Sequence, residues 1–358
     1  METRIVKART DGRIDTALME EAGKIIRSGG LVAMPTETVY GLAGDALNPE
    51  SSKKIYEAKG RPSDNPLIVH IADMEALPPI VRSVPEKAEI LAEAFWPGPL
   101  TMIFEKSDLV PLETTGGLGT VAVRMPKNEE ARAFIRASGG YIAAPSANRS
   151  GRPSCTKASH VYEDMEGRIP LIIDGGDSVI GLESTIVDLT GEVPCLLRPG
   201  YISIDALRDK IGEVVRDPAV IKAEEGIRPR APGMKYIHYA PKGMLHLVRG
   251  KKENVISRIN SLCKEASEKG MKTGVLSSED TAAKYRADVV IPLGNRDDYE
   301  SVAHGLFSSL RSMDSEGVDM IYSEEFETPG LGEAIMNRLM RAAGSREVDA
   351  DVESSDRK

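Results

Sequence analysis

The sequence has few cysteines and no long apolar run. Only three of its 358 residues are cysteine (Cys155, Cys195 and Cys263), and no two of them form a CxxC pair. This spacing argues against a disulfide framework and against a zinc site. No stretch approaches the roughly 18 apolar residues of a membrane-spanning helix, and the first residues lack the apolar core of a signal peptide. We therefore expect a cytoplasmic protein that does not enter a membrane.

Basic charge and aromatic residues are also scarce. The formal net charge is -9 at pH 7, and aromatic residues make up 4% of the chain. Proteins that hold the nucleic-acid backbone depend on clustered Lys and Arg, and single-strand binders add aromatic stacking platforms. A protein whose main task is to grip nucleic acid is therefore disfavoured, and an anionic ligand would have to be held by a local basic pocket.

Several catalytic signatures are missing as well. The sequence contains no HExxH, no GxxxxGK[ST] phosphate loop, no GxSxG and no GxGxxG fingerprint. These absences disfavour zinc proteases, P-loop nucleotide hydrolases, serine hydrolases and dinucleotide-dependent enzymes.

The length exceeds the size at which one hydrophobic core usually stops growing, so two domains are expected. Apolar runs and helical periodicity predict a mixed α/β domain over residues 1–212, with a helix from Ile14 to Gly30 that leads into a buried strand. Residues 213–243 are broken by proline and glycine and are predicted to form an interdomain linker. Strands and helices alternate regularly over residues 244–346, which predicts a smaller parallel, doubly wound α/β domain. Residues 347–358 are expected to be a disordered tail.

Polar and basic residues follow the first predicted strands. The segment from Pro35 to Asn48 is expected to be a tight polar loop at a strand end, where open α/β sheets bind ligands. Lys59 and Arg61 lie two residues apart at a helix end, and His70 lies on the following strand. Each feature has an ordinary alternative: a polar turn, basic residues that stabilise a helix C-terminus, and a core histidine with satisfied hydrogen bonds.

Charged and hydroxylated residues continue at later strand ends. Arg124 interrupts the apolar strand TVAVRMP and requires an anionic partner, either a ligand or a structural Asp or Glu. The segment from Ala143 to Ala158 carries small and hydroxylated residues that allow backbone N–H groups to approach phosphate oxygens. Ser184 and Arg198 lie at further strand ends. Together these residues predict an anion-binding cavity in the first domain.

Ten strings, in order along nearly the whole chain, resemble the YrdC-like family in its long form, threonylcarbamoyl-AMP synthases with an appended C-terminal domain. The strings are PTETVYGL, KGRPSDNPLIVHI, WPGPLT, TVAVRMP, AAPSAN, SGRPS, ESTIVD, LRPG, APGMKYIHYAP and GLGEAIMNR.

The resemblance implies an open twisted α/β fold with a positively charged central cavity, a linker that reaches over it, and a Rossmann-like second domain. The positions that match threonine-binding residues of the family are Thr38, His70, Arg124, Ala144 and Ser184. The positions that match nucleotide-binding residues are Lys59, Arg61, Asn65, Thr120, Ser146, Ser154 and Arg198, with Tyr239 of the linker expected to close over the ATP side. Lys59, Arg61 and Arg198 are the expected catalytic residues, because they would neutralise the triphosphate.

The resemblance also implies a reaction. L-threonine, bicarbonate and ATP would give threonylcarbamoyl-AMP, pyrophosphate and water, for threonylcarbamoyl-adenosine modification of tRNA next to the anticodon. Mg²⁺ is expected on the ATP phosphates rather than in a protein metal site. A downstream tRNA-modifying transferase complex is the expected partner, with at most weak direct contact to tRNA. Two alternatives remain open: a module that binds tRNA or double-stranded RNA, and a related carbamoyltransferase that forms a carbamoyl-adenylate.

Overall fold

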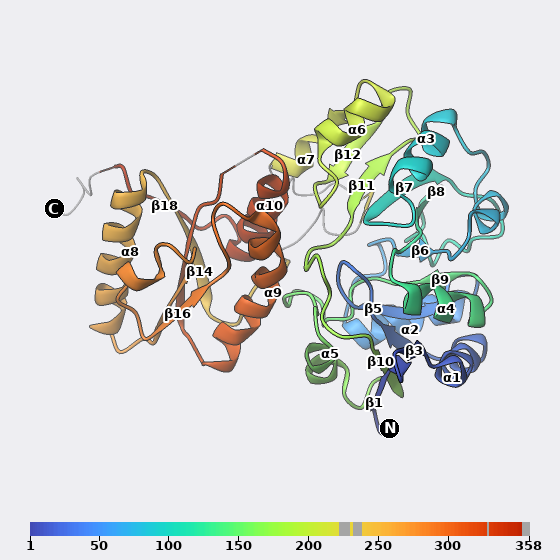
Figure 1. Ribbon diagram of the computed structural model, residues 1–358, viewed down its shortest axis with the longest axis horizontal. Coiled ribbons are helices and arrows are strands. Elements are labelled where there is room, and N and C mark those ends of the chain that lie inside the picture. Colours follow the sequence, from blue (N-terminus) through green and yellow to red (C-terminus); the bar gives the residue numbers. More distant parts are fainter. Residues whose placement is uncertain (222–229, 232–237, 328, 353–358) are drawn as a thin grey trace. The chain divides into compact units, whose positions relative to one another are not determined.

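The structure is a computed structural model that describes residues 1–221, 230–231, 238–327 and 329–352. The chain forms two compact units, residues 1–150 with 154–236 and residues 151–153 with 237–358 (Figure 1). The division at residue 236 lies within the segment predicted as a linker, and the limits of that linker stay a prediction. Within the described residues, no helix is both long and apolar enough to span a lipid bilayer.

The first unit is built on one mixed sheet of eleven strands. In order across the sheet, they are β1 (Arg4–Lys7), β10 (Leu171–Asp174), β4 (Val32–Met34), β5 (Gly41–Asp45), β9 (Ile142–Ala143), β6 (Ile68–His70), β8 (Thr120–Arg124), β7 (Leu100–Glu105), β11 (Thr185–Asp188), β12 (Cys195–Arg198) and β13 (Val215–Arg216). A short hairpin of β2 (Arg9–Thr10) and β3 (Arg13–Ile14) stands apart from this sheet. The helices of the unit are α1 (Thr16–Arg27), α2 (Pro49–Lys59), α3 (Glu86–Phe95), α4 (Glu129–Ala137), α5 (Ala158–Met165), α6 (Ile204–Ile211) and α7 (Pro218–Ile221). The predicted α/β class is confirmed.

Helix α1 shows how the sequence sets these elements. Asp15 caps it, because its carboxylate accepts a hydrogen bond from the Leu18 backbone N–H, so the helix starts two residues after the predicted Ile14. Its apolar positions, among them Leu18 and Ile26, are buried in a core that α1 shares with α4. Figure 1 shows these two helices side by side. The predicted amphipathic helix is therefore confirmed, apart from its first turn.

The segment predicted as one polar loop from Pro35 to Asn48 contains a strand. Residues 41–45 form β5, which pairs antiparallel with β4. Gly44 has no side chain to collide with Ile55, whose Cδ1 lies 3.0 Å from the position that a Cβ would take. Glycine and aspartate have low strand propensity, so the string GLAGD does not indicate a strand even though its backbone pairs on both edges.

The second unit contains a five-stranded sheet in which every pairing is parallel. The order is β16 (Val289–Pro292), β15 (Thr273–Ser277), β17 (Met320–Glu324), β14 (Met244–Arg249) and β18 (Glu347–Asp349). Figure 1 shows α8 (Lys252–Ser267) on one face, and α9 (Tyr299–Ser315) and α10 (Leu331–Ala343) on the other. The predicted parallel, doubly wound sheet is confirmed. The predicted alternation of strands and helices is interrupted between β15 and β16, where the chain forms only a 3-10 turn, Ala282–Lys284.

The predicted tail does not begin at residue 347. Glu347–Asp349 form β18 beside β14, where main-chain hydrogen bonds join Leu247 to Arg346 and Ala350 to Arg249. The Asp351 carboxylate also accepts the Lys251 backbone N–H at the start of α8. Val348 and Ala350 also pack against the hydrophobic core of the second unit. Main-chain pairing and this packing order a short acidic segment whose composition alone suggests disorder. Residues 353–358 of the predicted tail lie outside the described residues.

The close packing of α1 on α4 gives a test of the fold. A Cβ added at Gly23 would lie 2.3 Å from the Ala137 carbonyl oxygen. We expect Gly23→Ala to destabilise the first unit by about 1–3 kcal/mol, although alanine favours helix more than glycine does. Chemical denaturation followed by the fluorescence of Trp96, the single tryptophan, would report this unit alone. Gly119→Ala, where nothing lies within 4 Å, is the control; equal stability of the two variants would contradict the packing.

Candidate functional site

One row of residues crosses five strands of the first sheet. The register pairs His70 with Arg124, Arg124 with Thr101, Thr101 with Ile186, and Ile186 with Arg198. Residues that are directly opposite on neighbouring strands point to the same face. The row therefore gathers two guanidinium groups, an imidazole and a hydroxyl on one side of the sheet.

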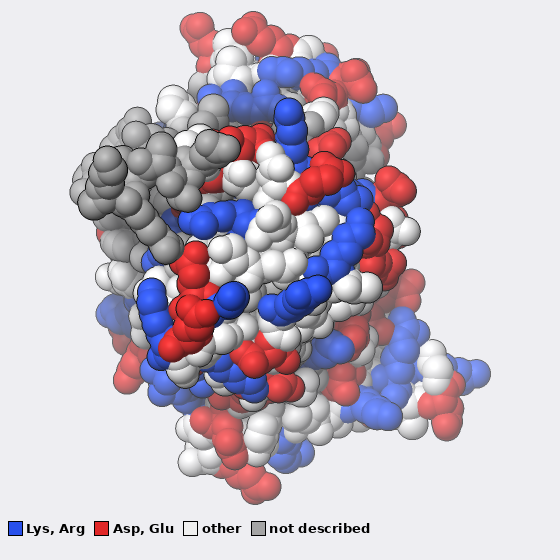
Figure 2. All heavy atoms as spheres, turned by 90° about the vertical axis from the view of Figure 1, so that its left-hand side faces the viewer, with Lys and Arg blue, Asp and Glu red and all other residues white. Residues whose placement is uncertain are grey.

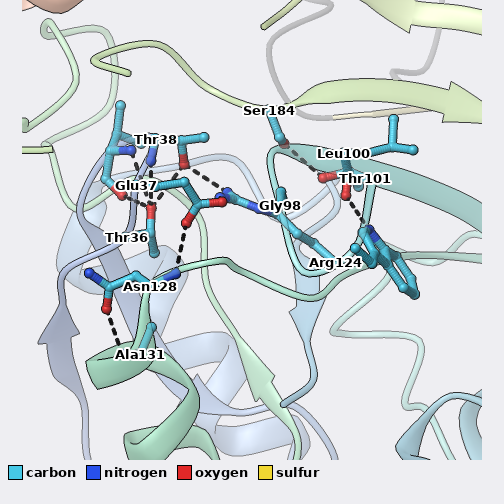
Figure 3. A network of polar contacts seen from close by, with 12 residues as sticks. Thr36, Glu37, Thr38, Gly98, Leu100, Thr101, Arg124, Asn128, Ala131 and Ser184 are labelled. Atoms are coloured by element: carbon cyan, nitrogen blue, oxygen red, sulfur yellow. Dashed lines mark hydrogen bonds and ion pairs between the residues drawn. The ribbon is translucent and has the colours of Figure 1, made fainter. Parts of the chain in front are cut away.

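Arg124 is the most constrained member of this row. Its side chain is buried, and it donates from Nη2 to Glu37 Oε1 at 2.6 Å, from Nη1 to Thr38 Oγ1 at 2.7 Å and from Nε to the Gly98 carbonyl at 3.2 Å. Figure 3 shows the guanidinium pointing toward Glu37 and Thr38. The anionic partner that the sequence requires for Arg124 is thus supplied by the chain itself, through Glu37.

Ser184 links the row to its far end. Its hydroxyl lies 2.7 Å from Thr101 Oγ1 and accepts a hydrogen bond from Arg198 Nη2 at 3.1 Å. Arg198 Nε also donates to the Ser184 carbonyl at 3.0 Å. Arg198 is buried, so this pair of contacts fixes its guanidinium beside Ser184. The structure places Arg198, a predicted nucleotide contact, next to a predicted threonine contact.

His70 is held as a neutral imidazole. Burial, with a further contribution from Arg124, lowers the pKa of His70 to about 3. Its Nδ1 lies 3.1 Å from the Ile68 carbonyl, which can only accept, so Nδ1 carries the proton and Nε2 is left as an acceptor. His70 therefore offers a hydrogen-bond acceptor, not a positive charge, to this face of the sheet.

Lys59 and Ser146 come together at a different place. The buried Lys59 ammonium donates to the backbone carbonyls of Ser146 and Asn148. The Ser146 hydroxyl donates to Asn148 Oδ1 at 2.5 Å. The loop that follows β9 is therefore folded around the end of α2, which brings the two predicted nucleotide contacts side by side.

Arg61 and Asn65 share one turn before β6. Arg61 Nη2 donates to the Pro66 carbonyl at 3.0 Å and to the Asn65 carbonyl at 3.3 Å. The Asn65 side chain is 1% exposed, and its Oδ1 accepts no hydrogen bond from the described residues. A buried amide oxygen without a donor costs about 1–3 kcal/mol, so this atom is suited to a donor that arrives with a ligand.

The remaining predicted residues divide between these places. Thr120 begins β8, at the end remote from Arg124. Ala144 is buried beside β6, where its N–H donates to the Ile68 carbonyl at 2.9 Å. Ser154 is buried, and its hydroxyl donates to Glu183, next to Ser184.

The predicted contacts thus lie at two ends of β6 and β8. His70, Thr38 and Ser184 lie at the Arg124 end, together with Arg198 and Ser154. Lys59, Arg61, Asn65 and Ser146 lie toward the Thr120 end, because β9 runs antiparallel to β6 and carries Ser146 past Ile68 toward Pro66. Thr120 and Arg124 are four residues apart on one strand, which corresponds to about 13 Å. Ile68, Ala122 and Ile103 form an apolar floor between the two ends.

Tyr239 belongs to the second unit. Its ring centroid lies 5.1 Å from that of Phe307, and the Arg338 guanidinium carbon lies 6.0 Å from the ring. The side chain is buried, and the backbone φ of 66° is unusual for a residue with a side chain. The predicted role of Tyr239 over ATP stays a prediction. Most of the linker around it, residues 222–229 and 232–237, lies outside the described residues.

Comparison with known proteins accounts for both units. Residues 24–200 match the family model of Sua5, YciO and YrdC described as telomere recombination, and residues 202–344 match the model described as threonylcarbamoyl-AMP synthase, C-terminal domain. A threonylcarbamoyl-AMP synthase of Pyrococcus abyssi is 50% identical over 334 residues, which cover 93% of this chain and 96% of the relative. The chain belongs to the threonylcarbamoyl-AMP synthase family.

Further members of the threonylcarbamoyl-AMP synthase family agree with this assignment. The relative from Bacillus subtilis is 49% identical over 329 residues, 92% of this chain and 93% of the relative. The crystal structure of P. abyssi Sua5 complexed with L-threonine is 48% identical and matches with a TM-score of 0.91 over 97% of this chain and 99% of that chain. The resemblance in the sequence is thereby confirmed for the family and for the fold.

Sequence reasoning missed three polar residues of the candidate site. Glu37, Thr101 and Glu183 hold Arg124, Ser184 and Ser154 respectively. Glu37 lies in the string PTETVYGL and Glu183 in ESTIVD. The sequence signal that could have pointed to Glu37 is Arg124, an arginine in a buried strand that needs an acidic partner. No pattern in the sequence says which acid reaches it across 87 residues.

The lowered pKa of His70 predicts how the free energy of unfolding of the first unit depends on pH. Because the folded-state pKa of about 3 lies below the unfolded value of 6.5, the unfolded chain binds the extra proton between these values. The contribution of His70 to the free energy of unfolding is therefore complete above pH 6.5 and is lost as the pH falls toward 3. Between about pH 4 and about pH 6, the free energy of unfolding should rise with pH more steeply in the wild type than in His70→Gln. The difference in slope should be up to about 1.4 kcal/mol per pH unit.

Urea denaturation followed by Trp96 fluorescence measures this difference in the first unit. His304→Gln is the control, because His304 is an exposed histidine of α9 in the second unit. Parallel pH profiles for the wild type and His70→Gln would show that His70 is not buried as a neutral ring.

Proposed function

We propose that this protein makes threonylcarbamoyl-AMP from L-threonine, bicarbonate and ATP, with release of pyrophosphate and water. The observation that carries the proposal is the division of polar groups between the two ends of β6 and β8, about 13 Å apart over an apolar floor. A product with an amino-acid carboxylate at one end and a phosphate and nucleoside at the other spans such a surface. The family relationship supports the same reaction.

The Arg124 end is suited to an amino acid. Arg124 and Glu37 form a buried ion pair, so a ligand with a negative charge alone would leave an uncompensated charge in a buried site. A zwitterion avoids this cost, because its carboxylate can face the guanidinium while its ammonium faces Glu37. Thr38 and the Nε2 acceptor of His70 are then available to the threonine hydroxyl and amine.

The Thr120 end is suited to a nucleotide. Lys59 and Arg61 bring positive charge, and Ser146 and Thr120 bring hydroxyl groups. The unpaired Oδ1 of Asn65 accepts a hydrogen bond from an amino or hydroxyl group of the nucleoside. Lys59 and Arg61 now donate to backbone carbonyls. When ATP binds, they would donate in part to its phosphate oxygens instead, because hydrogen bonds to charged oxygens are stronger.

The chemistry then requires positioning and charge stabilisation more than a protein nucleophile. The threonine amine adds to bicarbonate and water leaves, which gives a carbamate. A carbamate oxygen attacks the α-phosphorus of ATP, and the bond to the pyrophosphate oxygen breaks. Lys59 and Arg61 would neutralise the departing pyrophosphate, and Arg198, fixed by Ser184, would face the charge that develops on the carbamate side.

Mg²⁺ belongs to the nucleotide in this proposal. Among the described residues, no group of three or more His, Cys, Asp or Glu side chains is placed to hold a metal ion. The ATP phosphates, by contrast, are the oxygen ligands that Mg²⁺ commonly takes. Bound there, the ion would neutralise the triphosphate together with Lys59 and Arg61.

Kinetics of pyrophosphate release test the two ends separately. Arg124→Ala alone would leave the buried Glu37 without its cation. The informative variant is therefore Arg124→Gln combined with Glu37→Gln, which removes both charges. We expect its kcat/KM for threonine to fall about a hundredfold. Asn65→Ala should raise KM for ATP about tenfold and leave KM for threonine unchanged.

Arg136→Ala serves as the matched control, since Arg136 pairs with Asp73 on the surface. Trp96 fluorescence reports whether each variant remains folded. Turnover near the wild-type value in the folded Arg124→Gln, Glu37→Gln variant would refute the assignment of the threonine end.

The product identifies the reaction. Incubation with ATP, Mg²⁺, threonine and labelled bicarbonate should yield the mixed anhydride by mass spectrometry. Serine or carbamoyl phosphate in place of threonine should give little product, whereas equal product from carbamoyl phosphate would point to the carbamoyl-adenylate-forming alternative.

We further propose that the product passes to a tRNA-modifying transferase complex in the cytoplasm, with only weak direct contact to tRNA. Lys and Arg side chains are interspersed with Asp and Glu on the face shown in Figure 2, the side on which α8 lies in Figure 1. Such a mixture does not create the single-sign field that holds a nucleic-acid backbone. Filter binding of tRNA should therefore be weak and vanish as salt increases; tight binding at physiological salt would favour the RNA-binding alternative.

A further inference from the structure

A cavity of about 510 Å³ is lined by residues of the second unit, none of which takes part in the proposed reaction. Its walls are formed by Gly250, Lys252, Val255, Arg296, Glu324, Glu325, Phe326 and Glu327. The volume falls in the range of about 300–1,000 Å³ that small-molecule sites occupy.

The cavity occupies the position at which doubly wound sheets bind ligands. Except for Arg296, which follows β16, its lining residues lie at or beyond the carboxyl ends of β14 and β17, which are parallel neighbours. The chain leaves β14 through α8 and leaves β17 toward α10, and Figure 1 shows these helices on opposite faces of the sheet. Strands whose connections diverge in this way leave a crevice beyond their carboxyl ends. The location therefore follows from the topology of the unit.

Arg296 forms a fixed, flat wall of this cavity. Its Nη2 donates to Glu324 Oε2 at 2.5 Å, its Nη1 donates to the Glu325 carbonyl at 3.2 Å, and its guanidinium carbon lies 5.2 Å from the centroid of the Phe326 ring. Its Nε is buried and has no hydrogen-bond partner among the described residues. A guanidinium backed by an aromatic ring is a surface on which a planar base can stack.

Glu324 holds Arg296 and takes no direct part in ligand binding. Its carboxylate is 2% exposed and receives hydrogen bonds from Ser278, Thr281 and Tyr285 in addition to Arg296. These donors saturate the two oxygens. The wall is consequently rigid before any ligand arrives.

The remaining charged residues of the cavity lining are one lysine and two glutamates. Lys252 is the first residue of α8, a helix of 16 residues, and it is half-exposed with Asp280 as its surface partner. A helix amino end and an ammonium together favour a phosphate. The Asp351 carboxylate now accepts the Lys251 N–H at this helix end, and a bound phosphate would take its place. Glu325 and Glu327 bring carboxylate acceptors, of which Glu325 is partly neutralised by Arg249 at 3.3 Å. Carboxylates in this role accept hydrogen bonds from a ribose diol.

We propose that this cavity of the second unit is a binding site for a mononucleotide. The phosphate lies at Lys252 and the start of α8, the base stacks on Arg296, and the ribose hydroxyls donate to Glu325 and Glu327. In this arrangement the positive groups of the lining meet the phosphate and the base, and the carboxylates meet the ribose hydroxyls of the same ligand. It gives the second unit a ligand of its own, independent of the proposed catalytic residues.

Hydrogen exchange of the full-length protein with AMP as the probe tests the proposal. AMP should protect peptides that cover residues 250–256 and 323–327, with saturation in the millimolar range or below. Peptides over residues 59–66 report the first unit in the same experiment, so binding there is read separately. The 2′,3′-dideoxy analogue of AMP should bind more weakly at the second unit, because it lacks the diol.

Lys252→Ala is the primary variant, because Arg296→Ala would leave Glu324 buried without its cation. We expect Lys252→Ala to raise the AMP concentration needed for half-maximal protection about tenfold or more. Lys264→Ala, on the same helix with a side chain that is 79% exposed, is the matched control and should change nothing. The rate of pyrophosphate release should be unchanged in Lys252→Ala, because Lys59, Arg61 and Arg198 of the proposed reaction all belong to the first unit. This rate therefore reports the proposed reaction independently of AMP binding.

Three results would overturn the proposal: no protection of either second-unit peptide at millimolar AMP, the same protection by inorganic phosphate at the same concentration, or equal loss of AMP affinity in Lys252→Ala and Lys264→Ala. None of these results bears on the synthesis of threonylcarbamoyl-AMP, which the mass of the product measures.

Discussion

The buried ion pair between Arg124 and Glu37 is the constraint around which the first unit is arranged. A guanidinium inside a sheet must be neutralised and fully hydrogen-bonded, and Arg124 achieves this with three chain segments: the loop after β4, the turn before β7, and its own strand. Removing one partner of such a pair typically costs about 3–5 kcal/mol. The pair therefore fixes the loop at Thr38 against the Arg124 end of the sheet.

The row across the sheet extends this constraint to residues far away in the sequence. His70, Arg124 and Arg198 come from strands that are separated by more than fifty residues each, yet strand register alone places them on one face. Burial, with a further contribution from Arg124, lowers the pKa of His70 to about 3, so the imidazole stays neutral beside the two guanidinium groups. One sheet face thus combines two permanent cations with one permanent hydrogen-bond acceptor.

The sequence is informative where local pattern decides the structure and silent where distant contacts do. The second unit could be predicted nearly element by element, because strings such as TGVLS and VVIP alternate with amphipathic helices. Strands β5 and β18 could not, because GLAGD and EVD owe their order to main-chain pairing and close backbone approach. At the site, the need of Arg124 for an acid could be predicted, but Glu37 as that acid is a consequence of tertiary structure. The chemistry itself came from family resemblance, since no single motif defines it.

Each unit contains an arginine paired with a buried glutamate, Arg124 with Glu37 and the partly exposed Arg296 with Glu324. The two pairs differ in how many further hydrogen bonds the carboxylate can accept. Glu37 is held by Arg124 and, weakly, by the Asn128 N–H at 3.4 Å, so its oxygens retain capacity for another donor. Glu324 has all its capacity filled by Ser278, Thr281, Tyr285 and Arg296. An unsaturated pair can exchange a partner with a ligand at little cost, whereas a saturated one cannot. The first pair is therefore built to change when a zwitterion binds, and the second is built to remain a fixed wall.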